Sequence, residues 1–198
     1  MRWERFFEDL EDQLDSEWEA ERAALDTEAE RVRLSRIALR ERLVALTAAG
    51  CGVSVDLADG TVLTGTVAAV GADWLALGSD TGPAGVSIAP LASVSGLAVP
   101  HADLLASARR ASAGSVLRQR MTFGFVLRDL ARRRVPVTVH LATGRALSGT
   151  IDRAGADHLD LAVHDPGAPR RADAVRGHRI LSFTGVVWVR PDAPTAVP

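Results

Sequence analysis

Apolar and polar residues alternate along 53–77, which is the period of a β-strand with one buried face. The pair Asp59 and Gly60 interrupts the alternation and is typical of a tight hairpin, and Gly71 marks a second turn. Two further short apolar runs follow, at 86–88 and 94–99. The pattern therefore predicts five short strands in this part of the chain.

The same pattern occurs a second time. The segment VSVDLADGTVLTGTVAAVGADWLAL begins at Val53, and VTVHLATGRALSGTIDRAGADHLDL begins at Val137, 84 positions later. Thirteen of these 25 positions are identical without a gap, and SVSGLAV from Ser93 resembles SFTGVVW from Ser182. A fixed offset of this kind sets the architecture of a chain. The second copy predicts strands at about 135–142, 145–154, 157–163, 174–180 and 184–189.

Each set of strands follows a predicted helix. Residues 2–48 contain no Gly or Pro and are rich in good helix formers. Thr27 and Glu30 fit a capping box, so this stretch is either one helix or two. A helix is also predicted from Val116 to Arg133. Apolar residues recur every seven positions in the first stretch, at Trp18, Leu25, Val32, Leu39 and Leu46.

Five short strands in about 50 residues remove their exposed edges best by closing into a small barrel. Gly65 and Gly149 fall inside strands at matching places, where a sharp bend needs a residue without a side chain. The chain is therefore expected to hold two tandem helix-plus-barrel modules that superpose and face each other as a pseudo-dimer.

A helix followed by the pattern V-x-L-x-x-G-x-x-L-x-G-x-V resembles the Sm-like family, which includes the LSm and Hfq proteins. The resemblance covers residues 36–99 and 120–189. It implies SH3-like barrels that form rings and bind RNA through the turns after strands 2 and 4. The family's Asp-x-x-x-Asn is replaced by Val70–Trp74 and Ala154–His158. The matching residues are Leu57, Gly60, Leu63, Gly65 and Val67, then Leu141, Gly144, Leu147, Gly149 and Ile151.

The whole layout, including WERFFEDLE from Trp3, also resembles an uncharacterised actinobacterial protein family, which carries no function with it. The expected fold is α+β, with a long N-terminal helix or helix pair before two tandem five-stranded barrels of the Sm-like or SH3-like type. The predicted parts are an acidic helical arm (1–35), a helix with barrel 1 (36–99), a linker (100–114), a helix with barrel 2 (115–189) and a disordered tail (190–198).

Composition narrows the setting. Cys51 is the single cysteine, so an intrachain disulfide is impossible and a reducing cytoplasm is the expected location. The first residues are charged throughout and lack the apolar core of a signal peptide. No apolar run approaches the roughly 20 residues that cross a bilayer, so no membrane association is expected.

The net charge of −2 hides an asymmetry between the two ends. Residues 1–30 hold 12 acidic residues and 3 Arg, whereas residues 101–190 hold 15 Arg and 7 Asp. This distribution favours a basic surface for nucleic acid, or an acidic arm that docks on such a surface. The alternative is a solvated helix beside an arginine-rich module without any partner.

Candidate RNA-binding residues lie mostly in the second copy. Clustered arginines bind phosphate without reading sequence, although cations near a helix C-terminus also favour the helix dipole. Trp74 is expected either to stack on a base or to pack on a helix, and His158 stands at the matching position. The candidate arginines are Arg128, Arg132, Arg133, Arg134, Arg145 and Arg153.

No catalytic motif, cofactor or metal site is predicted. His140, His158, His164 and His178 all fall in the second copy, but they lack the spacing of a metal motif. The leading interpretation is a non-enzymatic, RNA-associated adaptor, and the sequence leaves open whether it forms a homo-oligomer. The alternative is a protein-interaction scaffold or oligomerisation module without nucleic acid. Its acidic arm would contact a partner through Trp3, Phe7, Leu10 and Trp18.

Overall fold

The computed structural model describes residues 18, 22, 25–79, 85–109, 119–168 and 170–192. The chain divides into two units, Met1–Ala38 and Leu39–Pro198. In the first unit residues 25–35 are helical, as are Trp18 and Arg22. This helix stops before residues 36–38, so the predicted stretch contains a break there and not at Thr27. The first 17 residues of the predicted arm lie outside the described residues.

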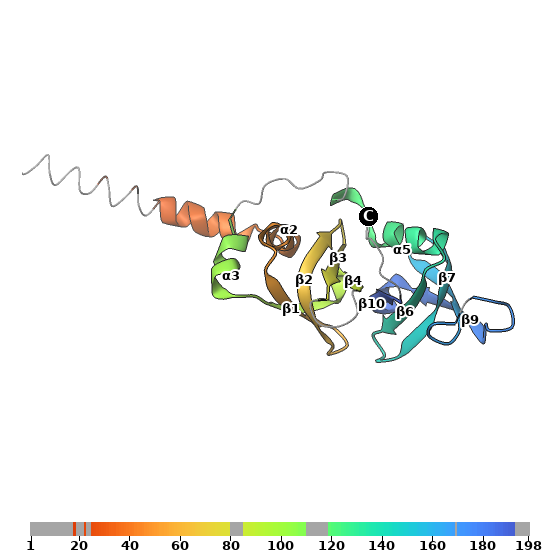
Figure 1. Cartoon of the computed structure of the whole chain (residues 1–198). Helices are drawn as coiled ribbons and strands as arrows, with labels where there is room; N and C mark the ends of the chain where they lie inside the picture. The colour runs from red at the N-terminus through yellow and green to blue at the C-terminus, as the bar shows by residue number, and fades with distance from the viewer. Residues whose placement is uncertain are drawn as a thin grey trace, which may run out of the picture. The chain divides into compact units, whose positions relative to one another are not determined.

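The second unit carries all ten strands of the described residues (Figure 1). The first half consists of helix α2 (Leu39–Ala49) and strands β1 (Gly52–Leu57), β2 (Val62–Val70), β3 (Trp74–Gly78), β4 (Val86–Pro90) and β5 (Val94–Ala98). The second half consists of helix α5 (Phe123–Arg132) and strands β6 (Pro136–Leu141), β7 (Ala146–Ala154), β8 (His158–Val163), β9 (Gly177–Ser182) and β10 (Val186–Pro191). Short 3-10 turns, η1 (Leu91–Ser93) and η2 (Phe183–Gly185), precede the last strand of each half.

The α+β class is confirmed, but the prediction of two five-stranded barrels is wrong. All ten strands form one antiparallel sheet in the order β5-β1-β2-β3-β4-β10-β6-β7-β8-β9. A closed barrel would need the two outer strands of each half to pair with each other. Instead β4 pairs with β10 of the other half, at Ile88 and Val189. The edge that closure was expected to remove is therefore covered by the neighbouring half.

The two halves nevertheless share one strand order, because β5-β1-β2-β3-β4 corresponds to β10-β6-β7-β8-β9. A bulge interrupts β2 between Val67 and Ala69, and another interrupts β7 between Ile151 and Arg153. The fourth strands (β4 and β9) and the last strands (β5 and β10) correspond in a different register from the one that the sequence suggested. In the last strands, Leu57 lies opposite Val94 and Leu141 lies opposite Val186. In the fourth strands, Ala76 lies opposite Ile88 and Asp160 lies opposite Ile180, so the offset in both pairs of strands is 92 and not 89.

The predicted boundaries also differ in three places. The predicted linker contains helix α3 (His101–Ser107), which packs against α2 where Arg42 donates to the Leu104 carbonyl. The predicted helix is interrupted at Met121 and Thr122, after two helical residues at 119 and 120, and helix α5 begins at Phe123, where the Thr122 side chain accepts a hydrogen bond from the Phe125 amide as the N-cap. The start predicted at residues 115–118 lies outside the described residues. Strand β10 continues to Pro191, inside the predicted tail.

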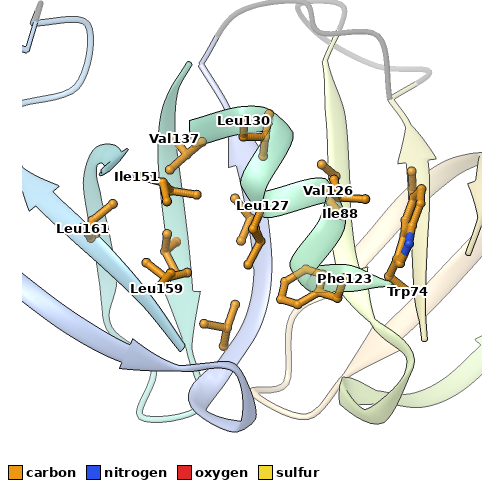
Figure 2. Packing of buried hydrophobic residues seen from close by; sticks show 14 of the residues in the cluster. Trp74, Ile88, Phe123, Val126, Leu127, Leu130, Val137, Ile151, Leu159 and Leu161 are labelled. Carbon is orange, nitrogen blue, oxygen red and sulfur yellow. The ribbon is translucent and has the colours of Figure 1, made fainter. Parts of the chain in front are cut away.

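Helix α5 joins the two halves through a shared core. Figure 2 shows it between Trp74 and Ile88 on one side and Ile151, Leu159 and Leu161 on the other. Its inward residues Phe123, Val126, Leu127 and Leu130 are all buried. The second cluster, under α2, receives Val187 and Trp188 from β10. Each half therefore contributes residues to the core of the other.

Candidate functional site

The turn between β2 and β3 holds the start of α5. The Ala72 amide donates to the Met121 carbonyl at 2.8 Å, and the Trp74 Nε1 donates to the same carbonyl at 2.9 Å. The Phe123 amide donates to the Asp73 carboxylate at 2.6 Å, which caps the helix N-terminus. Trp74 is fully buried, so its ring has no face open to a base in this structure. The turn predicted for RNA is occupied by the chain itself.

The matching turn of the second half is open. His158 stands where Trp74 stands, and its side chain is 47% exposed. Its Nδ1 lies 2.8 Å from the carboxylate of Asp157, which is 89% exposed. The hydrogen bond from His158 holds the pKa of Asp157 below its ordinary value. Neither residue caps a helix in the described part of the chain, in contrast to Asp73.

The same contrast extends over the outer surface of the strands. In the first half this surface consists of residues that are all buried under α5, namely Ala69, Trp74, Ala76 and Ile88. Strand register assigns to these positions Arg153, His158, Asp160 and Ile180 in the second half. We call the surface of β7, β8 and β9 that carries these four residues the open face. Ile180 is 76% exposed there, although its counterpart Ile88 is buried.

A groove of about 650 Å³ lies on the open face. The Arg170 guanidinium lines this groove and donates to both carboxylate oxygens of Asp152, at 2.6 and 2.8 Å. This hydrogen bonding, and then the positive charges of Arg170, His178 and Arg134, lowers the pKa of Asp152. The lining residues are Asp152, Arg153, Asp160, Arg170, His178, Arg179 and Ile180.

The six candidate arginines do not share one surface. Arg132 and Arg133 both pair with Asp129, at 2.7 and 2.8 Å, and Arg128 donates to the Gly155 carbonyl. Arg145 precedes β7 and Arg153 lies near its end, so they are separated by about 25 Å of extended strand. Arg153 lines the groove, and Arg134 is close enough to Asp152 to lower its pKa. Of the six, Arg153 therefore belongs to the open face.

The four histidines of the second half do not form a cluster, because each one interacts with a different residue. His164 is buried against the Thr150 hydroxyl at 2.9 Å, and the His178 Nε2 lies 3.9 Å from Asp152. His140 stacks on Trp188 with ring centroids 3.7 Å apart. Within the described residues, no group of three or more His, Cys, Asp or Glu side chains is close enough together to hold a metal ion.

Sequence reasoning missed Asp160 and Ile180 on the open face, and Arg179 on the edge strand β9 beside them. A signal for them was present in the repeat itself. Apolar Ala69 and Ala76 align with charged Arg153 and Asp160 at the fixed offset of 84, on a face that alternation assigns to the outside of the sheet. A position that is apolar in one copy and charged in the other marks a surface that only one copy buries.

The predicted contact residues Trp3, Phe7 and Leu10 lie outside the described residues, and Trp18 is a helical residue that is 67% exposed. Within the described part of the chain, no helix combines the length and apolar character needed to cross a membrane. Comparison with known protein families and with curated proteins finds no family model and no relative that matches this chain.

Proposed function

We propose that this chain is a non-enzymatic adaptor that presents the open face of its second half to a protein partner. In this proposal the first half and α5 form a fixed pair that supports β7, β8 and β9. The observation that carries it is the exposure of Ile180 at the position where Ile88 is buried by α5 and β10. An exposed large apolar residue among charged ones is typical of a docking surface.

The contact between the first half and the elements α5 and β10, called the internal joint below, supports the proposal because it is an example of what such a surface can bind. In the first half, the corresponding strands and turn receive a helix, a capped N-terminus and the edge of another strand. In the second half the same backbone framework is kept, with its bulge and its 3-10 turn. The outer side chains differ, as does the longer β8–β9 loop that carries Arg170, so the second half offers a similar strand framework to an occupant of different chemistry.

RNA binding, the leading prediction from sequence, has less support from this geometry. Asp152 and Asp160 lie among the arginines of the groove and would repel a phosphodiester backbone. Arg132 and Arg133 share the single carboxylate of Asp129, which offsets one of their two positive charges. Mixed charges with an apolar centre fit a protein surface better than a nucleic acid.

A photo-crosslinking amino acid placed at Ser182 tests the adaptor proposal in cells of the source organism. Ser182 is exposed on the edge of the open face, and Thr143, exposed in the hairpin before β7, is the matched control position. We expect a discrete protein adduct from position 182 and none from position 143. Adducts that disappear on nuclease treatment would support RNA instead, and the same adducts from both positions would contradict a specific face.

A further inference from the structure

The outer edge of β9 has the same backbone geometry as the outer edge of β4, which pairs with β10. The Leu91 amide donates to the Asp73 carbonyl at 2.8 Å, and the Phe183 amide donates to the Asp157 carbonyl at 2.8 Å. Opposed residues of an antiparallel pair alternate between bonded and non-bonded pairs. Because the pairs Leu91–Asp73 and Phe183–Asp157 are bonded, the alternation makes Ile88–Ala76 and Ile180–Asp160 non-bonded pairs. The backbone N–H and C=O of Ile88 and of Ile180 therefore point away from the preceding strand.

At Ile88 those outward groups meet β10, whereas at Ile180 no strand of the described residues meets them. The edge of β9 also carries a weak internal substitute for a partner. The Arg179 Nη1 donates to the His178 carbonyl, another outward group, at a long 3.4 Å. An incoming strand would replace this bond with a shorter backbone bond and free the guanidinium for a carboxylate.

We infer that the β9 edge binds an extended acidic segment of a partner protein as an added antiparallel strand. This inference rests on the proposed adaptor function and names the chemistry of its partner. Successive side chains of a strand point to opposite faces of the sheet, so Ile180 and Arg179 would contact side chains on opposite faces of the added strand. Apolar residues would pack beside Ile180, and carboxylates on alternate positions would pair with Arg179.

The side chains argue against a second copy of this chain as the occupant. The free strand that matches β10 is β5, whose residues Val94–Ala98 include no carboxylate for Arg179 or Arg153. The helix that matches α5 is α2, where Arg42 stands in place of Val126 and is already bonded to Ser107 of α3. An apolar copy of the internal joint would therefore leave charges of the open face unpaired.

Two synthetic peptides of equal length test the inference on the full chain, one alternating Glu and Val and the other alternating Lys and Val. Labelled peptides are titrated with the protein, and binding is followed by fluorescence anisotropy. We expect the Glu–Val peptide to bind at least about tenfold more tightly than the Lys–Val peptide, because Arg179 favours a carboxylate and repels an ammonium group. Equal binding of both peptides, or no binding of either, would overturn the inference.

Two variants separate the backbone contribution from the charge contribution. Ile180→Pro removes an N–H that β8 does not use, so the sheet keeps its bonds while the added strand loses one. Ile180→Thr keeps the N–H and is its matched control. We expect the proline variant to weaken Glu–Val binding at least about tenfold more than the threonine variant. Arg179→Glu, at an exposed position, should reverse the preference between the two peptides even if the proline variant folds poorly.

The remaining outcomes distinguish this inference from the adaptor function on which it rests. Persistent crosslinks from position 182 with unchanged peptide binding in Ile180→Pro would overturn strand addition and leave the adaptor function standing. Self-association in sedimentation runs that Ile180→Pro abolishes would assign the edge to a second copy. Binding of mixed-sequence single-stranded RNA that Arg179→Glu removes and Ile180→Pro leaves intact would overturn both proposals.

Discussion

The outer face of β2–β4 and the open face of β7–β9 are built on the same framework and have opposite fates. The first is apolar and buried beneath α5, with Trp74 fully enclosed. The second keeps the bulge, the turn and the strand order, but it carries Arg153, Asp160 and an exposed Ile180. A repeated backbone therefore does not imply a repeated interface, because the side chains determine what each copy binds.

The comparison is tested most strongly by truncating the two residues that follow the matched turns. Trp74→Ala should destabilise the chain by about 3–5 kcal/mol, since it opens a cavity beside Ile88 and leaves the Met121 carbonyl with one donor fewer. His158→Ala, at the matching exposed position, should change the stability by less than about 0.5 kcal/mol. Urea unfolding of both variants measures the contrast. Similar losses in the two would show that the second turn is also a structural joint.

Two glycines test what the halves have in common. A Cβ at Gly65 would overlap the Gly78 carbonyl oxygen, and a Cβ at Gly149 would overlap the Ala162 carbonyl oxygen. Gly65→Val and Gly149→Val should therefore each cost about 3 kcal/mol or more and lower the melting temperature alike. Gly52→Val and Gly185→Val are matched controls, because a Cβ at either position meets nothing within 4 Å. Wild-type melting in both strand variants would contradict the shared framework.

The helix cap gives a smaller version of the same contrast. Asp73→Ala removes the acceptor for the Phe123 amide and should cost about 1 kcal/mol. Asp157→Ala removes only an exposed hydrogen bond to His158, so the expected change lies within about 0.5 kcal/mol. Thermal unfolding followed by circular dichroism measures both values. A larger loss for Asp157→Ala than for Asp73→Ala would reverse the assignment of the cap.

The smallest expected effect concerns His140, which stacks on Trp188 where the first half has Asp56 opposite Gly96. Burial, and then the charge of Arg190, holds the pKa of His140 below its ordinary value of 6.5, while Asp59 acts in the opposite direction. The unfolded chain therefore takes up this proton more readily than the folded chain. The resulting stabilisation is complete above pH 6.5 and is lost as the pH falls through the folded-state pKa.

Replacing His140 with Gln should flatten this pH dependence of the unfolding free energy. Urea midpoints measured for both proteins above and below pH 6.5 isolate the contribution of His140 from that of the other histidines. The wild-type protein should lose more stability on acidification than the variant. An identical loss in the two proteins would show that other groups are responsible.

Local patterns in the sequence were enough to predict the strands and their repetition. The hairpin at Asp59 and Gly60 and the matched glycines at Gly65 and Gly149 lie where alternation and turn chemistry put them. Sheet closure was predicted incorrectly because it depends on which edge partner is available. Alternation does not distinguish an edge that pairs within its own half from one that pairs across, as Ile88 does with Val189.

The candidate site was predicted less well than the fold, for a related reason. The sequence separates Trp74 from Met121 by 47 positions, so the bond that buries the tryptophan has no local signature. Arg132 and Arg133 form a cluster of charge in the sequence, but Asp129, one helical turn earlier, pairs with both of them in the structure. Arg153, predicted as one of the RNA-binding arginines, lines the groove of the open face together with Asp152 and Asp160.

Because β10 is synthesised after the whole first half, the first half cannot complete its core until β10 has been made. Val187 and Trp188 belong to the core under α2, and β10 covers the edge of β4. A ribosome makes the first half well before these residues, so the emerging chain holds an unfinished core and an uncovered β4 edge until β10 is released. During that interval the growing polypeptide is most exposed to pairing with the wrong strand. Slow elongation between the halves would lengthen this vulnerable period, and it would not let the first half fold on its own.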